Sequence, residues 1–118
     1  MKSEIKPWGT YEVLYTDENC KIKKVSVKPS HRLSYHYHVH SKEGWVITRG
    51  RGTVILDEEE IPIKAGDQVM IQYHMPHRVS NTSENEDLIF IEVRTGTNLD
   101  DNEDIVRLSD DYDRVDSD

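Results

Sequence analysis

The stretch HRLSYHYHVHSKEGW, residues 31–45, contains four of the six histidines of this chain. Three of them, His36, His38 and His40, recur at every second position. Residues two apart in a β-strand point to the same face, so these imidazoles would lie side by side and could converge on one cation. The stretch therefore predicts either a metal site on a β-strand or a histidine-rich strand that faces solvent.

Two donors outside this triplet favour the metal site. Glu43 offers a carboxylate shortly after the histidines, and His77 offers an imidazole from a distant segment. Nitrogen and oxygen donors together suit a divalent ion and leave positions open for water or substrate. We therefore expect a divalent metal cofactor, with zinc named first and Mn, Fe, Co or Ni as alternatives.

The segments around this stretch are short runs rich in Val, Ile, Thr and aromatic residues, separated by turn-forming residues. Such runs favour β-strands, and no segment before residue 100 has a helical period. Many short strands at this spacing indicate a sandwich or a barrel. The expected strands are Thr10–Tyr15, Lys21–Val27, Arg32–His36, Trp45–Thr48, Thr53–Leu56, Ile61–Ile63, Gln68–Ile71, His77–Ser80 and Leu88–Arg94.

The length of 118 residues predicts a single domain, since domains commonly have about 100–150 residues. We expect an N-terminal arm or strand at 1–15, a barrel core at 20–95 and an acidic C-terminal segment at 96–118. Within that last segment, Ile105–Leu108 either packs on the barrel or belongs to a solvated tail.

The net charge of -8 makes nucleic acids and anionic membranes poor partners for the surface as a whole. A small anionic ligand remains possible where basic residues line a pocket. The single cysteine, Cys20, excludes an intramolecular disulfide framework, and no apolar run is long enough for a membrane span. Neither a signal peptide nor a membrane span is evident, so we expect a cytoplasmic protein.

A first block of sequence resembles a motif of the cupin superfamily. The motif is Gly, five residues, His-x-His, three or four residues, Glu, six residues and Gly. The matching residues here are His36, His38, Glu43 and Gly50, and Ser30 stands where the motif begins with Gly.

A second block resembles the other cupin motif, which is Gly, five residues, Pro-x-Gly, two residues, His, three residues and Asn. Gly66, His77 and Asn81 match it, whereas Gln72 and His74 replace the Pro and the second Gly. Both motifs in order imply an all-β fold, the cupin double-stranded β-helix or jelly-roll barrel.

The spacing of the first motif distinguishes the three alternating histidines. Four residues separate His38 from Glu43, as the motif requires, whereas only two would separate His40 from Glu43. The resemblance therefore implies that His36, His38, Glu43 and His77 are the metal ligands. His40 is left as a neighbour of the ligands, an acid/base group or an exposed residue.

Four segments carry a closer resemblance: KPWGTYEVL (6–14), KIKKVSVKPSHRLSYHYH (21–38), MPHRVSN (75–81) and EVRTGTNLDDNEDIVRLSDDYDR (92–114). They look like the type II mannose-6-phosphate isomerase family, whose domain also forms the C-terminal part of bifunctional mannose-1-phosphate guanylyltransferases. The similarity covers nearly the whole chain, and the last segment is the most specific to that family.

This resemblance implies that the chain interconverts mannose 6-phosphate and fructose 6-phosphate through an enediol. A metal would polarise the carbonyl, an acid/base group would move the proton, and cationic side chains would hold the phosphate. The expected partners are a small sugar phosphate and a second copy of the chain in a homodimer. Candidate catalytic residues are His40, His74 and Lys42, and candidate substrate-binding residues are Arg32, Arg78 and Trp45.

Three residues depart from the pattern of that family near the histidines. His36 replaces a Gln, Ser41 replaces an Arg, and Gly44 replaces a His. Two alternatives to an isomerase therefore stay open: a domain that binds a sugar phosphate or nucleotide sugar without turnover, and another metal-dependent cupin enzyme such as a dioxygenase.

Overall fold

The structure is a computed structural model that describes residues 2–100 and 103–112. Within these ranges the chain forms eleven strands and no helix, so no described helix could cross a membrane. The prediction of an all-β chain is confirmed. The strands are β1 (Ser3–Lys6), β2 (Gly9–Thr16), β3 (Cys20–Val27), β4 (Tyr35–His38), β5 (Ser41–Arg49), β6 (Arg51–Leu56), β7 (Glu59–Lys64), β8 (Gln68–Ile71), β9 (His77–Asn81), β10 (Leu88–Gly96) and β11 (Ile105–Ser109).

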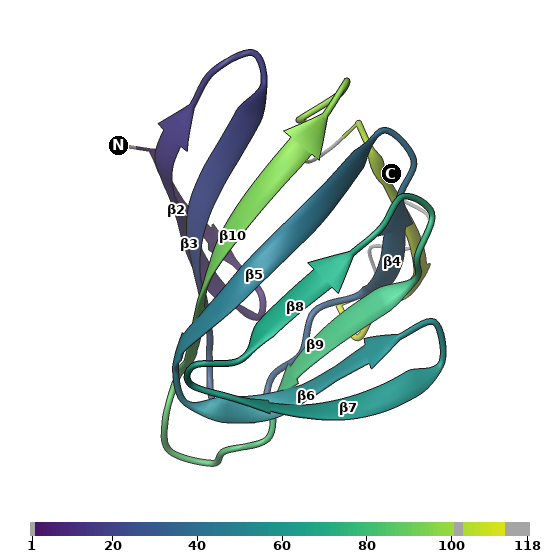
Figure 1. Cartoon of the computed structure of the whole chain (residues 1–118). Helices are drawn as coiled ribbons and strands as arrows, with labels where there is room; N and C mark the ends of the chain where they lie inside the picture. The colour runs from purple at the N-terminus through teal and green to yellow at the C-terminus, as the bar shows by residue number, and fades with distance from the viewer. Residues whose placement is uncertain (1, 101–102, 113–118) are drawn as a thin grey trace.

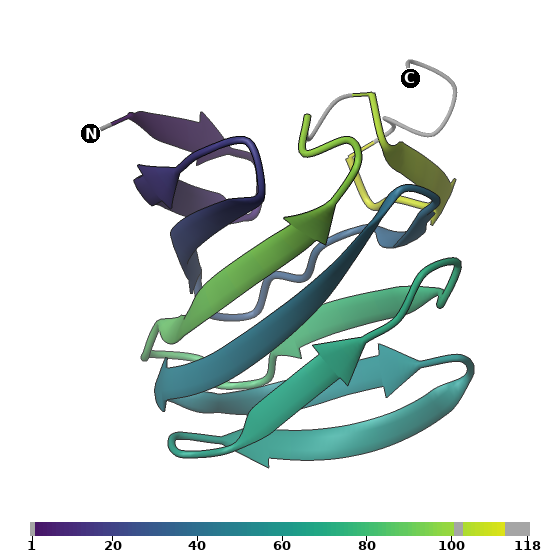
Figure 2. The same cartoon turned by 45° about the horizontal axis from the view of Figure 1, so that its top comes forward.

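Two antiparallel sheets enclose the core (Figures 1 and 2). The first sheet has six strands in the order β1-β2-β3-β10-β5-β8, and the second has five in the order β11-β4-β9-β6-β7. From β4 to β10 the chain passes repeatedly from one sheet to the other, which is typical of a jelly roll. Residues distant in sequence therefore meet in the space between the sheets.

Alternate residues of the central strands point into that space. In β5, Trp45 and Ile47 are buried, whereas Val46 between them is 44% exposed. This is the period-two pattern of a sheet with one buried face. The apolar core that results comprises Trp8, Tyr11, Val13, Val25, Val27, Trp45, Ile47, Val54, Ile63, Val69, Ile71, Val79, Leu88 and Phe90.

Two turns keep a left-handed backbone where the cupin motifs have Gly. Ser30 has a φ of 61° and His74 a φ of 62°. This region crowds the Cβ atom and costs a non-Gly residue roughly 1 kcal/mol or more. The two departures from the motifs thus leave the turns themselves in place.

Of the strands near the histidines, β4 begins and ends later than the sequence predicts, and β5 begins earlier. β4 begins at Tyr35 rather than at Arg32, which forms only an isolated bridge with Ser80. β4 ends at His38, and β5 already begins at Ser41. His40 therefore lies in a tight turn and not on the same strand face as the other two histidines.

The C-terminal segment adds a strand to the barrel. β11 pairs antiparallel with β4, with Ile105 opposite His38 and Arg107 opposite His36. Of the two alternatives for Ile105–Leu108, packing on the barrel is the one found. Residues 101–102 and 113–118 of the expected acidic segment lie outside the described ranges.

Candidate metal centre

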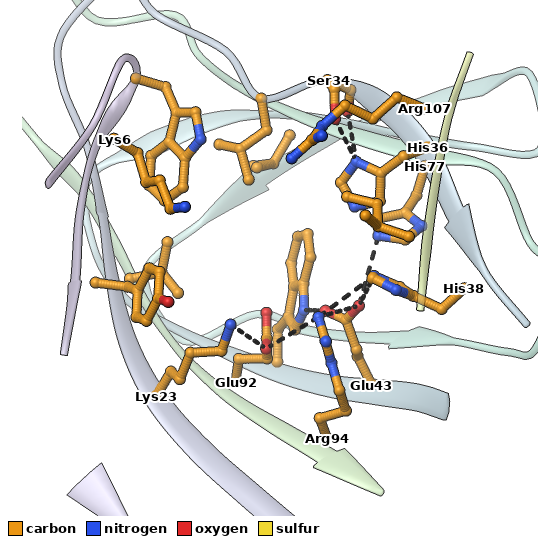
Figure 3. A pocket seen from close by; sticks show the side chains of 17 residues that line it. Lys6, Lys23, Ser34, His36, His38, Glu43, His77, Glu92, Arg94 and Arg107 are labelled. Atoms are coloured by element: carbon orange, nitrogen blue, oxygen red, sulfur yellow. Dashed lines mark hydrogen bonds and ion pairs between the residues drawn. The ribbon is translucent and has the colours of Figure 1, made fainter. Parts of the chain in front are cut away.

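A cavity between the two sheets contains most of the buried polar side chains of the described chain (Figure 3). The second sheet contributes the histidines and Arg107, and the first contributes the carboxylates and the other cations. Apolar and aromatic side chains form the remaining wall. The polar lining residues are Lys6, Lys23, Ser34, His36, His38, Glu43, His77, Glu92, Arg94 and Arg107.

Three histidines form one compact cluster in this cavity. His36 and His38 point inward from β4, and His77 lies opposite His36 on the neighbouring strand β9. One ring nitrogen from each lies within 4.8 Å of the other two, and all three residues are buried. These histidines could therefore hold a metal ion together.

The Nδ1 atom of each clustered histidine faces a backbone carbonyl oxygen. The distances are 3.0 Å from His36 to Ser34, 2.8 Å from His38 to Asp104 and 3.0 Å from His77 to Met75. A carbonyl oxygen only accepts a hydrogen bond and so favours a protonated Nδ1, and at His36 the hydroxyl of Ser34 contacts the same Nδ1 at 2.7 Å. Such bonds fix the orientation of metal-binding imidazoles in proteins.

Glu43 reaches the cluster from β5 in the opposite sheet. Its Oε2 atom lies 2.9 Å from Nε2 of His38 and 3.7 Å from Nε2 of His77. Its other oxygen, Oε1, accepts a hydrogen bond of 2.8 Å from the indole of Trp45. The indole thus orients the carboxylate, and Oε2 faces the imidazoles.

Burial and neighbouring charges set the protonation of these groups. Burial lowers the pKa of both His36 and His77, so both are neutral at pH 7. Burial opposes ionisation of Glu43, but Arg94 and then His38 outweigh it and hold the pKa of Glu43 well below its usual range. Neutral imidazoles and an ionised carboxylate are the forms that bind a metal.

The donor set fits a divalent cation. Oε2 of Glu43 lies 2.9 Å from Nε2 of His38, and the Arg94 guanidinium contacts both atoms, at 3.5 Å and 3.3 Å. Three imidazoles and one carboxylate are ligands that a divalent ion such as zinc accepts.

Glu92, a charged residue beside the cluster, was not among the site residues predicted from the sequence. Glu92 on β10 pairs with Lys23 at 3.5 Å and with Arg94 at 3.7 Å. Burial, followed by the charge of Glu43, raises the pKa of Glu92 to about 7. The signal was present in the segment LIFIEVRTG (88–96), where Glu92 and Arg94 share the buried parity of Leu88.

The candidate catalytic residues lie outside this cavity lining. His40 and His74 are exposed, and Lys42 occupies the strand parity opposite to Glu43. His74 instead adopts the left-handed turn, and its backbone amide donates to the carbonyl of His38 at 2.7 Å. Nothing in this placement supports proton transfer by these three residues.

Two of the candidate substrate-binding residues serve other contacts. Arg32 is exposed and makes a two-pronged ion pair with Asp111, at 2.8 and 2.9 Å. Arg78 is buried and donates to the carbonyls of Leu33 and Ser109. Neither lines the cavity, whereas Trp45 does, stacked on Phe90 with ring centroids 4.3 Å apart.

The two residues that depart from the family pattern near Glu43 occupy different faces of β5. Gly44 lies on the outer face, where an added Cβ would meet the Met70 sulfur at 3.2 Å. A side chain at position 44 would not reach the cavity. Ser41 is buried, and its hydroxyl donates to Asp104 at 2.6 Å.

Curated relatives match this chain through a fraction of their own length. Mannose-1-phosphate guanylyltransferase ManC of Salmonella typhimurium is 33% identical over 110 residues, which cover 93% of this chain and 22% of that protein. The Mannose-1-phosphate guanylyltransferase of Escherichia coli K12 is 32% identical over 110 residues, covering 93% and 23%. The chain therefore spans less than a quarter of these two relatives.

A solved structure shares the fold. The sugar phosphate isomerase of the cupin superfamily from Silicibacter pomeroyi superposes with a TM-score of 0.65 at 20% identity, covering 73% of this chain and 58% of that one. The predicted cupin double-stranded β-helix is thus confirmed. The family model described as Mannose-6-phosphate isomerase C-terminal matches residues 2–110. By this match, the chain belongs to the Mannose-6-phosphate isomerase C-terminal family.

Proposed function

We propose that this chain is a metal-dependent isomerase that interconverts mannose 6-phosphate and fructose 6-phosphate. Membership of its family supports a sugar phosphate as ligand. The observation that carries the proposal is the cluster of three buried imidazoles, with one ring nitrogen of each within 4.8 Å of the others, and the Glu43 carboxylate 2.9 Å from His38. This arrangement suits a divalent ion bound inside the cavity.

The metal would be held by His36, His38, His77 and Glu43, with zinc as the first candidate. When bound, it would polarise the sugar carbonyl and stabilise negative charge on the enediolate oxygen. The chain itself orients these donors. The indole of Trp45 donates a hydrogen bond to Oε1 of Glu43 and thereby holds the carboxylate in place.

Proton transfer between C1 and C2 requires a group that accepts a proton from one carbon and returns it to the other. Glu92 lines the cavity, next to Arg94 and in the first sheet with Glu43. With a pKa of about 7, its carboxyl group is present in both protonation states near neutral pH. Glu92 is therefore our candidate for the proton carrier, in place of His40, His74 and Lys42.

The direct test is an assay of purified, metal-loaded protein with mannose 6-phosphate, in which fructose 6-phosphate is quantified. We expect turnover in the wild type, loss of turnover on chelation, and recovery when the metal is restored. His38→Ala provides the control. Product formation no faster than in His38→Ala would contradict the proposal, and saturable binding without turnover would favour a sugar-phosphate-binding domain.

A further inference from the structure

The outer face of the first sheet carries two neighbouring cross-strand rows that are rich in apolar residues. Both rows run over β2, β3, β10, β5 and β8, which lie side by side in one layer (Figures 1 and 2). The first row is Tyr15, Ile22, Val93, Gly44 and Met70, and the second is Glu12, Lys24, Ile91, Val46 and Gln68. We call these residues the outer rows, since they alternate along the strands with the inward-facing residues of the core and the cavity.

Half of the large apolar side chains that the described chain exposes lie in the outer rows. They are Tyr15, Val46, Met70 and Val93, which are 53%, 44%, 57% and 38% exposed. The solvent face of an antiparallel sheet is ordinarily polar, and exposed apolar residues are ordinarily scattered singly. A contiguous apolar face of this kind therefore indicates a surface that binds a partner.

The outer face of the second sheet provides an internal comparison. There, Thr53 of β6 pairs with Ser80 of β9. The next outward residue of β6, Ile55, pairs with Arg78 on one side and with Glu60 on the other. This face follows the polar pattern that the first sheet lacks, so apolar exposure is not a general property of the barrel.

The outer rows carry no net charge. Their charged residues are Glu12 and Lys24, which lie opposite each other on β2 and β3. The chain as a whole has a net charge of -8, so two copies repel each other over most of their surfaces. A second copy can therefore approach most easily through a face without excess charge, and this face meets that condition.

The size of the face suits a contact between two copies. At ~3.3 Å per residue and ~4.8 Å between neighbouring strands, these five strands present a face of about 600 Å². Two such faces would together bury about 1,200 Å², which is the lower end of the range for specific protein interfaces. We therefore expect a reversible dimer and not a permanent one.

We propose that two copies of this chain pack face to face through the outer rows, related by a two-fold axis that runs along β10. β10 is the middle one of the five strands, so the axis places Val93 opposite Val93 of the second copy. Ile22 then faces Gly44 of the second copy, and Tyr15 faces Met70. Glycine leaves room for the larger side chain, and no residue of the outer rows faces a like charge in this arrangement.

The test is sedimentation equilibrium of the full chain at several concentrations, which measures the dissociation constant of the dimer. Val93→Lys should raise this constant at least about tenfold, because it places two ammonium groups against each other across the axis. Val46→Lys should raise it as well, because it buries a charge in an apolar contact. The matched control is Val106→Lys, which changes a valine of the same 38% exposure in the second sheet and should leave the constant unchanged.

A mixture of two variants tests the axis itself. Val93→Lys and Val93→Glu should each dimerise more weakly than the wild type, and mixing them in equal amounts should restore the dimer, because opposite charges then face each other. Circular dichroism establishes that the variants are folded, and Val46→Lys keeps the test valid if the Val93 variants unfold.

A wild type that stays monomeric up to millimolar concentration would overturn the proposal and assign the face to an unlike partner. So would a dimer that dissociates in Val106→Lys but not in Val93→Lys or Val46→Lys. Folded Val93 variants that form no dimer when mixed would contradict the axis along β10. These measurements do not depend on turnover, so their outcome is independent of the proposed isomerase.

Discussion

The clustered imidazoles are oriented by backbone carbonyls, not by acidic side chains. Ser34, Asp104 and Met75 supply these carbonyls from three separate segments. Each bond holds its ring in place, and at His36 the Ser34 hydroxyl contacts the same Nδ1 at 2.7 Å. A carbonyl cannot be removed by substitution, so this part of the orientation depends on the backbone path.

Glu92 is the residue whose replacement separates proton transfer from metal binding. Glu92→Gln keeps the size of the side chain but cannot accept the proton, so kcat should fall at least about 100-fold. The metal stoichiometry should remain that of the wild type, because Glu92 is not a donor of the cluster. Steady-state kinetics and elemental analysis would check this.

The matched control for Glu92→Gln is Glu60→Gln, which changes an exposed carboxyl on β7. A Glu92→Gln variant with the kcat of this control would assign proton transfer elsewhere.

His74 is expected to matter for the turn and not for the chemistry. Its φ of 62° is accessible to Gly without a Cβ penalty. We expect His74→Gly to keep full turnover and to change the free energy of unfolding by no more than about 1 kcal/mol. His74→Val should destabilise by more than that, because β-branched residues rarely adopt this conformation.

Denaturant unfolding and the isomerase assay measure both effects of these His74 variants. Loss of turnover in a stable His74→Gly would restore the catalytic role that the sequence suggested.

At the scale of elements, the turn between β4 and β5 is fixed from a distance by Asp104. Its carboxylate accepts hydrogen bonds from the amides of Val39 and His40 at 3.1 and 2.8 Å, and from the hydroxyl of Ser41. Its carbonyl holds Nδ1 of His38. One buried residue thus sets both the end of β4 and the orientation of a metal donor.

Replacing Asp104 by Ala should therefore weaken the metal site without removing a ligand. Three donors would lose their acceptor, and the turn that positions His38 would relax. We expect a 10- to 100-fold loss of metal affinity, the range found for groups that orient metal ligands. Competition with a chelator would measure it, with Asp57→Ala at an exposed turn as control.

An Asp104→Ala variant that matches Asp57→Ala in metal affinity would show that the turn holds without its carboxylate.

At the scale of the whole molecule, the strand periodicity predicted an all-β sandwich or barrel, and the resemblance to the cupin motifs implied the jelly roll and the meeting of His36, His38 and His77. Both signals are local or follow a fixed motif. The place of His40 could not be predicted this way, since its turn depends on Asp104, which is 64 residues away. Arg107 needed the pairing of β11 with β4, which no local pattern contains.

Glu92 and Arg94 represent an intermediate case. Their parity with Leu88 and Phe90 marked them as inward-facing, and charged residues at such positions are functional candidates. They were not predicted as site residues, because most of the strand is apolar. Their pairing with Lys23 and Glu43 appears only once the order of strands in the first sheet is known.

The pH dependence of stability follows from the buried histidines. In metal-stripped protein, His36 and His77 have lowered pKa values, so below about pH 6.5 the unfolded chain binds protons that the folded chain does not. Their contribution to stability is complete above pH 6.5 and is lost as the pH falls. Glu92, with its raised pKa, acts in the opposite direction between about pH 4.5 and 7.

Because these effects oppose each other, the prediction compares the pH dependence of stability in the wild type with that in a variant. Between pH 7.5 and 5.5, the wild type should lose more free energy of unfolding than a His36→Gln, His77→Gln double variant that retains Glu92. Denaturant unfolding at each pH measures both. Equal losses would mean that these histidines do not remain neutral in the folded protein.

The most direct test of the metal centre is titration of metal-stripped protein with Co²⁺, followed by its visible absorption. We predict one ion per chain, with ligand-field bands that reach their full intensity at one equivalent and disappear in His38→Ala and in Glu43→Gln. Absence of stoichiometric binding, or identical bands in the wild type and both variants, would contradict a metal site built from these residues.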